Sequence, residues 1–295
     1  MLSVLVPIYN FDVVSFINDI YKQCEIANIE FEILCYDDCS SNVFKSKNNT
    51  LANRQKITYF ELQKNIGRSK IRNLLAENAK FDNLLFVDCD SKTVSDFYIK
   101  NYLNTLTTYP VIYGGRSYES FPPSDPNLYL RWFYGIKREV KLATERTTEP
   151  YRNFMTNNFV IDKAIVLKIP FDESLDGYGY EDILFAQQLK KSNISIHHID
   201  NSLVHVGLEN TSEFLKRTAN GMKNLAQIIR HNQVDEDIKI YRVYKKINRT
   251  KSKWIIKLIY ALLKKYIRNN LKSNTPNLLY FDLFKLQHLM NEMKS

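Results

Sequence analysis

The chain has 295 residues, of which 44% are hydrophobic and 25% are charged, and its formal net charge is +9. This length and apolar content allow one large α/β domain with an appendage, and they exclude a chain that is disordered over most of its length. None of the four cysteines belongs to a CxxC pair or pairs closely with a histidine. We therefore expect them to be reduced core residues of a cytosolic protein.

The positive charge is confined to one segment. Residues 239–272 hold twelve of the 41 Lys and Arg residues and no Asp or Glu, whereas acids slightly outnumber bases in the rest of the chain. The first residues lack the basic and long apolar regions of a signal peptide. The longest mostly apolar run, Trp254 to Leu263, is shorter than the ~20 residues that span a bilayer. These features predict a cytoplasmic protein without a transmembrane anchor.

Strand-like and helix-like segments alternate in the first part of the chain. Helix-compatible stretches lie near residues 12–28 and 68–80. The apolar, β-rich runs are Leu2–Val6, Phe31–Tyr36, Ile57–Phe60, Leu84–Val87 and Val111–Tyr113. Such alternation predicts an α/β fold with a mostly parallel sheet flanked by helices, in which ligands bind at the carboxyl ends of the strands.

The second half of the chain is less regular. Residues 116–156 have poor periodicity and predict long loops with short helices. Residues 160–169 and 194–198 are strand-like, and residues 183–191 are helix-like. The composition changes after Arg230, so we expect a catalytic domain over residues 1–230 and a basic helical extension over residues 231–295.

Two acids follow the fourth apolar run. Asp88 and Asp90 are separated by one residue, so in extended chain their side chains leave the same side of the sheet while Cys89 points away. Two oxygen donors at the end of a buried strand can hold Mg²⁺ or Mn²⁺ and leave sites open for phosphate oxygens. The pair predicts a diphosphate site, although taken alone it fits a solvated turn or a helix cap equally well.

Five motifs occur in an order that resembles the family 2 glycosyltransferases. They are Val6-Pro7-Ile8-Tyr9-Asn10, Tyr36-Asp37-Asp38-Cys39-Ser40, Asn65-Ile66-Gly67-Arg68 with Arg72-Asn73, Asp88-Cys89-Asp90, and Gly177-Tyr178-Gly179-Tyr180-Glu181-Asp182. The resemblance covers about residues 1–230. It implies a GT-A fold with a Rossmann-like, mostly parallel sheet, and an inverting hexosyltransferase that takes its sugar from a nucleotide donor, most often UDP-linked. Cys39 stands where glycine often follows the acid pair, and Tyr180 stands where tryptophan often precedes the second acid pair.

The resemblance assigns the early motifs to the nucleotide. Pro7 and Tyr9 would line the base pocket, and either Asp37 or Asp38 would accept hydrogen bonds from the uracil or the ribose. Arg72 would supply a fixed fork of donors, whereas its alternative role is a solvated charge on a helix face. The remaining residues assigned to the nucleotide are Asn65, Gly67 and Asp88.

The metal site would contain Asp90 and His205. The histidine matches one that completes the metal site in related enzymes, and an imidazole ligand favours Mn²⁺ over Mg²⁺. His205 lies between two valines, so a buried core histidine with satisfied hydrogen bonds is the alternative.

Two acids at the start of a helix would carry the chemistry. By resemblance, Asp182 is the general base and Glu181 helps to bind the acceptor sugar, although an acid there is also a favourable helix cap. Asp182 would take a proton from an acceptor hydroxyl as that oxygen displaces the nucleoside diphosphate, which inverts the anomeric centre. The residues expected near the sugars are Asn157, Asn158, Tyr178 and Trp132.

The basic segment predicts an amphipathic helix from Trp254 onward. Such a helix can lie on an anionic membrane surface, and the alternative is that its apolar face packs on the catalytic domain. We expect a peripheral enzyme on the inner face of the cell membrane that uses a glycan or lipid-linked acceptor in polysaccharide or glycolipid synthesis. No nucleic acid is expected, because no recognised nucleic-acid-binding motif accompanies the charge.

Three other functions fit parts of the sequence. A haloacid-dehalogenase-like, Mg²⁺-dependent phosphatase also carries two acids after a strand, but Lys92 stands where its motif requires threonine. A basic nucleic-acid-binding protein would use the charged tail. A nucleotide-sugar-binding protein that has lost catalysis would keep the same pocket.

Overall fold

The computed structural model describes residues 1–175, 179–231, 233 and 238–294. The chain forms two compact units. Unit 1 contains Met1–Glu119, Val140–Leu175 and Glu181–Gly207, and unit 2 contains Ser120–Glu139, Leu208–Ser295 and Asp176–Tyr180, each as far as it is described. The predicted domain boundary near residue 230 stays a prediction, because compactness alone does not test which parts fold independently.

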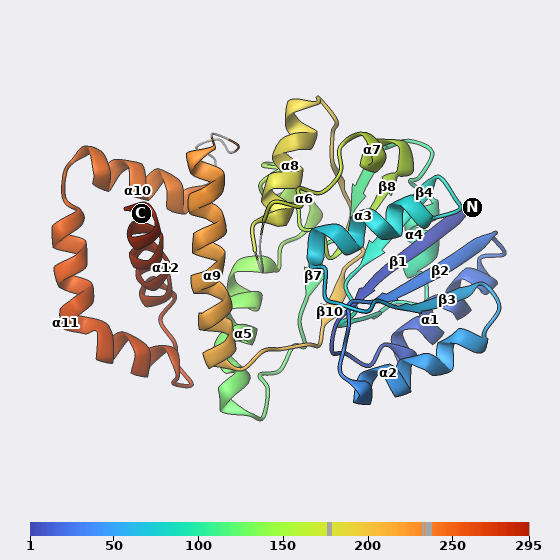
Figure 1. The fold of residues 1–295 in the computed structure, drawn as a ribbon, viewed down its shortest axis with the longest axis horizontal. Coiled ribbons are helices and arrows are strands. Elements are labelled where there is room, and N and C mark those ends of the chain that lie inside the picture. The colour runs from blue at the N-terminus through green and yellow to red at the C-terminus, as the bar shows by residue number, and fades with distance from the viewer. Residues whose placement is uncertain (176–178, 232, 234–237, 295) are drawn as a thin grey trace. The chain divides into compact units, whose positions relative to one another are not determined.

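Unit 1 is built on a seven-stranded mixed sheet with the order β3-β2-β1-β4-β8-β6-β9 (Figure 1). β1, β2, β3 and β4 run parallel, while β8 is antiparallel to both β4 and β6. The strands are β1 (Leu2–Ile8), β2 (Phe31–Asp37), β3 (Ile57–Glu61), β4 (Asn83–Val87), β6 (Val111–Tyr113), β8 (Asn158–Asp162) and β9 (His197–His198). The predicted α/β class is confirmed.

Helices cover both faces of this sheet. In β1, Val4 and Val6 join a buried cluster with residues of α1 and α4, whereas Leu5 joins a second cluster with residues of α3, α7 and α8. This alternation follows from the period of two in a strand. The helices of unit 1 are α1 (Val14–Ile26), α2 (Asn42–Asn48), η1 (Asn49–Asn53), α3 (Arg68–Asn78), α4 (Tyr98–Leu103), α6 (Ala143–Thr147), α7 (Lys163–Lys168) and α8 (Glu181–Lys191).

A second, three-stranded sheet lies beyond the carboxyl end of β4. Its order is β5-β10-β7, formed by β5 (Ser91–Lys92), β10 (Leu203–His205) and β7 (Arg116–Ser117). The antiparallel register pairs His205 with Ser91, the residue after Asp90. The small sheet therefore brings residue 205 beside the acid pair.

Two predicted strands are shorter than expected. The strand-like run from Val160 to Ile169 ends at Asp162, whose side chain accepts a hydrogen bond from the Ala164 amide and caps α7. An N-cap of this kind satisfies an amide at the start of a helix, so the apolar residues that follow continue as a helix. In the second run, residues 194–198, only His197 and His198 pair in the sheet.

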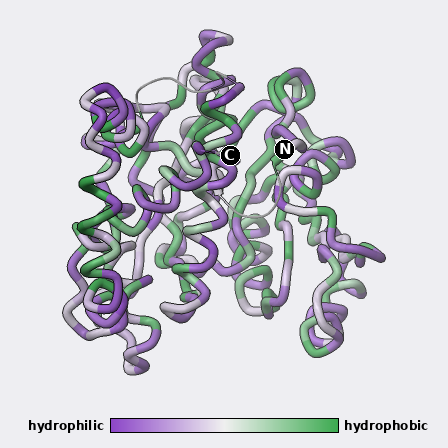
Figure 2. Tube along the Cα trace, turned by 60° about the vertical axis from the view of Figure 1, so that its left-hand side comes forward, coloured by the Kyte–Doolittle hydropathy of each residue, from purple (hydrophilic) through white to green (hydrophobic). Residues whose placement is uncertain are grey.

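Unit 2 is helical in the part of the chain that the structure describes. Its elements are η2 (Pro126–Leu128), α5 (Tyr129–Tyr134), the π-helical η3 (Gly135–Glu139), α9 (Thr211–Arg230), α10 (Lys239–Arg249), α11 (Lys253–Leu271) and α12 (Leu278–Glu292). Hydrophobic and hydrophilic residues alternate along the helices of the chain (Figure 2). Their core contains Leu130, Phe214, Ile267 and Phe281, and none of the described helices is long and apolar enough to cross a membrane.

The cysteines follow the prediction in part. Cys24 and Cys35 are buried, whereas Cys39 and Cys89 are half-buried, and all four are free thiols. Burial raises the pKa of Cys24 to about 12. The Cys24 thiol is accordingly protonated and unreactive at neutral pH.

Candidate active site

Polar residues of unit 1 gather at the edge of the sheet where β1, β2, β4 and β6 end. These strands point the same way, so their carboxyl ends meet at one edge. β8 runs in the opposite direction and begins there, and the Asp88 amide donates to the Asn157 carbonyl at 2.9 Å. We call the charged residues at this edge the acid–arginine cluster. They are Arg68, Arg72, Asp88, Asp90, Arg116, Glu181, Asp182 and His205.

Asp88 lies among three arginines. Its Oδ1 accepts a hydrogen bond from Arg72 at 2.7 Å, and its Oδ2 lies 3.6 Å from Arg68 and 3.8 Å from Arg116. The Arg72 side chain is only 2% exposed, which excludes the alternative of a solvated helix-face charge. A carboxylate held by a buried guanidinium is fixed in position as well as in charge.

Asp90 lies beside His205. Its Oδ1 is 3.3 Å from His205 Nδ1, and its backbone carbonyl accepts a hydrogen bond from the Val206 amide at 2.9 Å. Burial disfavours the charged form of Asp90, but His205, Arg116 and Arg68 outweigh this effect and hold the pKa of Asp90 well below its usual value. Gly207 makes the close approach possible, because a Cβ at that position would lie 2.5 Å from the Asp90 Cβ.

These two side chains fit a divalent cation. Two donor atoms on neighbouring vertices of an octahedral site lie about 3 Å apart, which compares with 3.3 Å here. Oxygen and imidazole nitrogen together suit Mn²⁺. The described residues contain no cluster of three His, Cys, Asp or Glu side chains that could hold a metal. Substrate oxygens and water would therefore have to complete the coordination.

Glu181 and Asp182 form the start of α8, as predicted. Arg68 Nε lies 3.0 Å from Glu181 Oε1, so one guanidinium contacts both Asp88 and Glu181. Burial and then the neighbouring charge of Glu181 raise the pKa of Asp182 to about 7. A carboxyl group with such a pKa is suited to exchange protons near neutral pH.

Asp37 and Asp38 are both buried and both hold loops in place. Asp37 Oδ1 accepts from the Ser40 amide at 2.6 Å, and the two Asp38 oxygens accept from the Ile66 and Gly67 amides at 2.6 and 3.0 Å. Burial raises the pKa of Asp38. Each acid therefore holds a different segment, and contact of either one with the uracil or the ribose stays a prediction.

The other predicted nucleotide residues lie in the same part of unit 1. Pro7 is in β1 and Tyr9 follows it with a half-exposed ring. Asn65 donates to the Asp38 carbonyl at 3.0 Å, and Gly67 precedes α3 with φ +88°, a conformation that favours glycine. Cys39, at the position where related enzymes often have glycine, also has a positive φ of +64°.

The residues predicted to contact sugars are not all alike. Asn158 is fully buried, and its side chain accepts from Tyr98 and Tyr102 and donates to the Gly115 and Asn201 carbonyls. With its hydrogen bonds used inside the fold, Asn158 has a structural role, and its contact with a sugar stays a prediction.

Asn157 is 4% exposed, and it contacts the site through its backbone carbonyl. Trp132 lies in α5 of unit 2 and packs against Tyr129 with ring centroids 5.4 Å apart. Tyr178 lies outside the described residues. Sugar-binding roles for these three residues remain predictions.

Two arginines of the cluster carry no role in the sequence prediction. Arg68 belongs to one of the five motifs, whereas Arg116 belongs to none of them. Its signal is the Gly114-Gly115-Arg116 sequence directly after β6, which places a cation at the carboxyl end of a strand parallel to β4. Arg116 lies 3.1 Å from His205 Nδ1.

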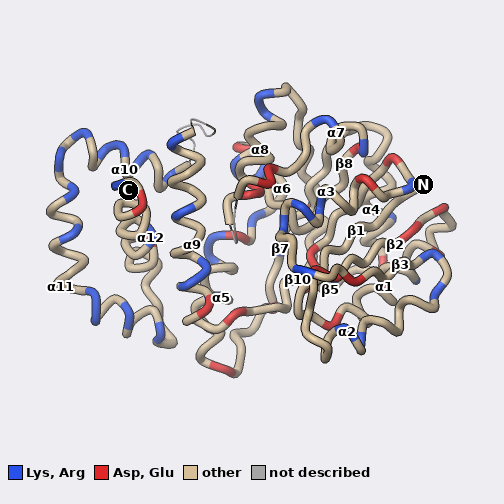
Figure 3. Tube along the Cα trace, in the orientation of Figure 1, with Lys and Arg blue, Asp and Glu red and all other residues tan. Residues whose placement is uncertain are grey.

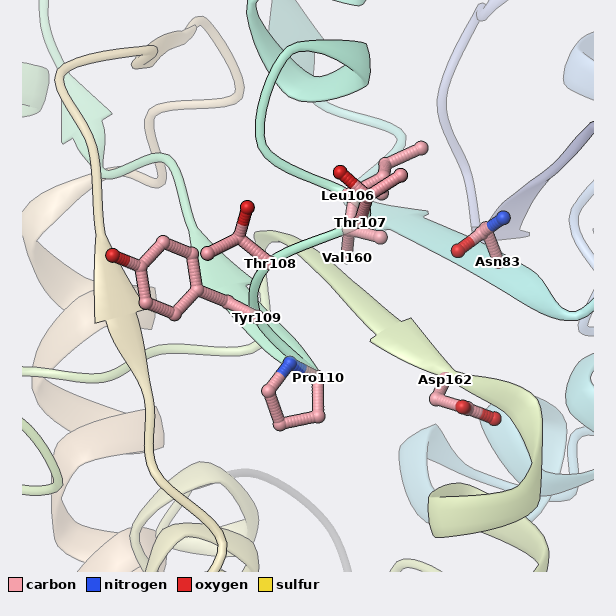
Figure 4. Close-up of a pocket in the computed structure, with 8 residues that line it drawn as sticks. All are labelled: Asn83, Leu106, Thr107, Thr108, Tyr109, Pro110, Val160 and Asp162. Carbon is pink, nitrogen blue, oxygen red and sulfur yellow. The ribbon is translucent and has the colours of Figure 1, made fainter.

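A small hollow lies away from this cluster (Figure 4). Asn83 at the start of β4 and Asp162 at the end of β8 line it together with residues 106–110. Because Asp88 follows the other end of β4, the hollow is at the opposite edge of the sheet and is separate from the candidate active site.

The fold and the charged edge together define the class of GT-A glycosyltransferases. Residues 3–272 match the family described as "Glycosyltransferase like family 2", and the chain belongs to that family. It is therefore a family 2-like enzyme that transfers a sugar from a nucleotide sugar, as predicted. A search among curated protein sequences gave no match.

Solved structures confirm the fold. A mannosyltransferase from Pyrobaculum calidifontis in complex with GDP-Man and Mn²⁺ has a TM-score of 0.56 at 16% identity, covering 78% of this chain and 64% of that one. S. aureus TarS 1–349 in complex with UDP-GlcNAc has a TM-score of 0.51 at 18% identity, covering 100% and 90%. Glucosyl-3-phosphoglycerate synthase from Mycobacterium tuberculosis has a TM-score of 0.52 at 12% identity, covering 80% and 81%.

Proposed function

We propose that this enzyme transfers a sugar, with inversion, from a UDP-linked donor to a hydroxyl group of a glycan or lipid-linked acceptor. The observation that carries the proposal is Arg68, whose guanidinium lies 3.6 Å from Asp88 and 3.0 Å from Glu181. A single side chain therefore connects the acids after β4 with the acids at the start of α8. These are the two groups that a donor site and a base for the acceptor require.

The donor would lie along the sheet edge. Tyr9 offers an exposed ring for the base, and the loops held by Asp37 and Asp38 would surround the ribose. Arg68 and Arg116 supply positive charge beside Asp88, where a diphosphate needs it. Solved relatives have been crystallised with UDP, UDP-GlcNAc or GDP-mannose, which makes uridine the first choice and guanosine the second.

Asp90 and His205 would hold the divalent cation. When bound, such a cation neutralises charge on a leaving diphosphate. Mn²⁺ is the cation in two of the similar structures, and Mg²⁺ is the alternative. The low pKa of Asp90 keeps this ligand ionised across the physiological range.

Asp182 would act as the general base. Its carboxylate takes the proton of an acceptor hydroxyl while that oxygen forms a bond to the anomeric carbon. The bond from that carbon to the diphosphate oxygen breaks, and the nucleoside diphosphate leaves with the electron pair. Arg68 holds Glu181 beside the base, where its carboxylate can accept a hydrogen bond from the acceptor sugar. One displacement inverts the anomeric centre.

The proposed biological role is the synthesis of a surface polysaccharide or glycolipid at the inner face of the cell membrane. The support for this location is the basic, partly apolar helix α11, which carries large exposed apolar side chains. The chemistry proposed above does not depend on that location.

The test is a donor panel with Mn²⁺: UDP-glucose, UDP-galactose, UDP-GlcNAc and GDP-mannose, assayed for release of nucleoside diphosphate. Asp182→Asn should lower turnover by about 10²–10⁴-fold while donor binding persists. Asp90→Asn should weaken Mn²⁺-dependent binding of the donor. Asp96→Asn is the matched control, because Asp96 is an exposed acid in the same unit.

Binding and chemistry fail in different ways. If none of the four nucleotide sugars binds with Mn²⁺ present, the assignment of the donor site is wrong. If a product forms with the anomeric configuration of the donor, the single displacement by way of Asp182 is wrong even though the donor site stands.

A further inference from the structure

One side of α11 presents large apolar residues to solvent. They recur at spacings of three and four, as residues on one face of a helix do. We call this side the outer face of α11. It consists of Trp254 (66% exposed), Ile255 (40%), Leu258 (52%), Ile259 (40%), Leu262 (75%) and Tyr266 (59%).

A different side of the same helix packs inside unit 2. Tyr260, Ile267 and Leu271 are buried in a cluster with Phe281 and Phe284 of α12. Ile267 is 0% exposed. The helix is therefore anchored by one apolar side while a second apolar side faces solvent.

Cations border the outer face. Lys257, Lys264 and Arg268 recur at spacings of seven and four along one border of this face, and Lys265 directly follows Lys264. They belong to residues 239–272, which contain twelve Lys and Arg residues and no acid. Figure 3 shows α10 and α11 carrying Lys and Arg without Asp or Glu. An apolar strip beside a row of cations is the pattern of helices that lie in the interface of an anionic bilayer.

We propose that the outer face of α11 is a membrane-docking surface that inserts into the headgroup region of an anionic lipid bilayer. Trp254 and Tyr266 stand at the two ends of the strip, where amphipathic rings suit the boundary between acyl chains and headgroups. Lys and Arg along the border reach the lipid phosphates, because their long stems allow the charge to stay in the polar layer. This inference goes beyond the proposed reaction and is independent of it.

The charge on α11 favours a bilayer over a second copy of the chain. In a symmetric dimer through the outer face, the same residues of both copies would meet. Two acid-free segments with twelve cations each would then be brought together. Such like-charge contact is unfavourable, whereas each Lys or Arg near an anionic surface favours membrane binding.

Vesicle flotation of the full chain tests the proposal. The vesicles contain phosphatidylcholine with phosphatidylglycerol in one arm and phosphatidylcholine alone in the other. Wild type should float with the first and only weakly with the second. Leu258→Ser with Leu262→Ser should weaken partition at least about tenfold, since burial of one leucine side chain alone is worth that much. Lys264→Gln with Lys265→Gln should weaken binding to the anionic vesicles only.

The matched control is Ile26→Ser with Leu279→Ser, which removes two apolar side chains of similar exposure from other surfaces. It should float as wild type does. The proposal is wrong if wild type binds neither vesicle or if the α11 leucine variant floats like the control. It is also wrong if sedimentation shows a dimer that the leucine variant abolishes while vesicle binding stays unchanged.

Discussion

Two regions of the molecule differ in how charged and apolar side chains are exposed. They are the acid–arginine cluster of unit 1 and the outer face of α11 in unit 2. In the cluster, Asp88 contacts three arginines, one of which is 2% exposed. On α11, large apolar side chains are 40–75% exposed, and no acid lies in the surrounding segment. The first region pairs Asp88 and Glu181 with arginines inside the fold, whereas the second keeps cations and apolar surface available to something outside it.

This difference has an energetic consequence. A substitution within the cluster removes a partner from a buried charged group. It should therefore lower the free energy of unfolding together with the activity. A substitution on the outer face of α11 changes side chains that are already exposed to solvent. It should therefore weaken membrane binding and leave the free energy of unfolding nearly unchanged. The change in the free energy of unfolding caused by each substitution therefore tests this difference between the cluster and the outer face of α11.

The largest effect is expected for Arg72→Ala. It removes a buried guanidinium from Asp88 and should lower the free energy of unfolding by about 3–5 kcal/mol, measured in urea by circular dichroism. Arg152→Ala is the control, because Arg152 forms an ion pair of the same 2.7 Å length with Glu149 but is 33% exposed. That surface pair should contribute less than about 1 kcal/mol. If both substitutions lowered the free energy of unfolding equally, the buried ion pair of Arg72 would be no more important for stability than an exposed one.

The next effect is expected for Gly207→Ala. The added Cβ would lie 2.5 Å from the Asp90 Cβ, so Asp90 must move. We expect about 1–3 kcal/mol of destabilisation from overpacking and a higher Mn²⁺ concentration for half-maximal activity. Gly67→Ala is the contrast, because a Cβ there meets no atom within 4 Å although φ is +88°. It should leave the Mn²⁺ dependence unchanged, and an unchanged dependence in folded Gly207→Ala would argue against Asp90 as a ligand.

A third effect depends on pH. Folding raises the pKa of Asp182 from 3.8 to about 7, so the folded state binds a proton that the unfolded state has lost between these values. The contribution of Asp182 to stability therefore falls as pH rises from about 4 to 7. Asp182→Asn removes this dependence and should have a higher Tm than wild type at pH 8, with the difference shrinking toward pH 4. The kcat/KM of wild type should rise with pH and level off above about 7.

Thermal unfolding of wild type and Asp182→Asn across pH 4–8 tests the predicted change in the Tm difference. Asp96→Asn should follow wild type, because that acid is exposed. If the Tm difference between Asp182→Asn and wild type were constant across this range, the raised pKa of Asp182 would be wrong.

The fold was largely predictable because its strands are short, continuous apolar runs. The runs at residues 2–6 and 84–87 lie within β1 and β4, since a strand buried on both faces needs apolar residues throughout. The run from Val160 to Ile169 was misread for the same reason. Apolar character alone does not separate a buried strand from a buried helix, and the boundary is set by the capping carboxylate of Asp162.

The site was predictable where residues follow one another and was missed where pairing brings them together. Asp88 and Asp90 are visible as a motif, but Arg116 reaches His205, 89 positions later, only because β7 and β10 pair. Asn158 is expected near a sugar only because its segment resembles a family segment near the acceptor and the transferred sugar. Its complete burial depends on Tyr98 and Tyr102, which the local sequence does not reveal.

The smallest effect is expected on the outer face of α11, where one helix provides its own control. Leu258→Ser with Leu262→Ser should change the free energy of unfolding by no more than about 0.5 kcal/mol per site, because both side chains are more than half exposed. Ile267→Ser, five residues further along but fully buried, should cost about 3 kcal/mol or more through lost burial and an unsatisfied hydroxyl. Urea unfolding of both variants separates the two sides of the helix. A large loss for the outer pair would mean that this face is held by the protein itself, and the surface would then no longer be available to a membrane.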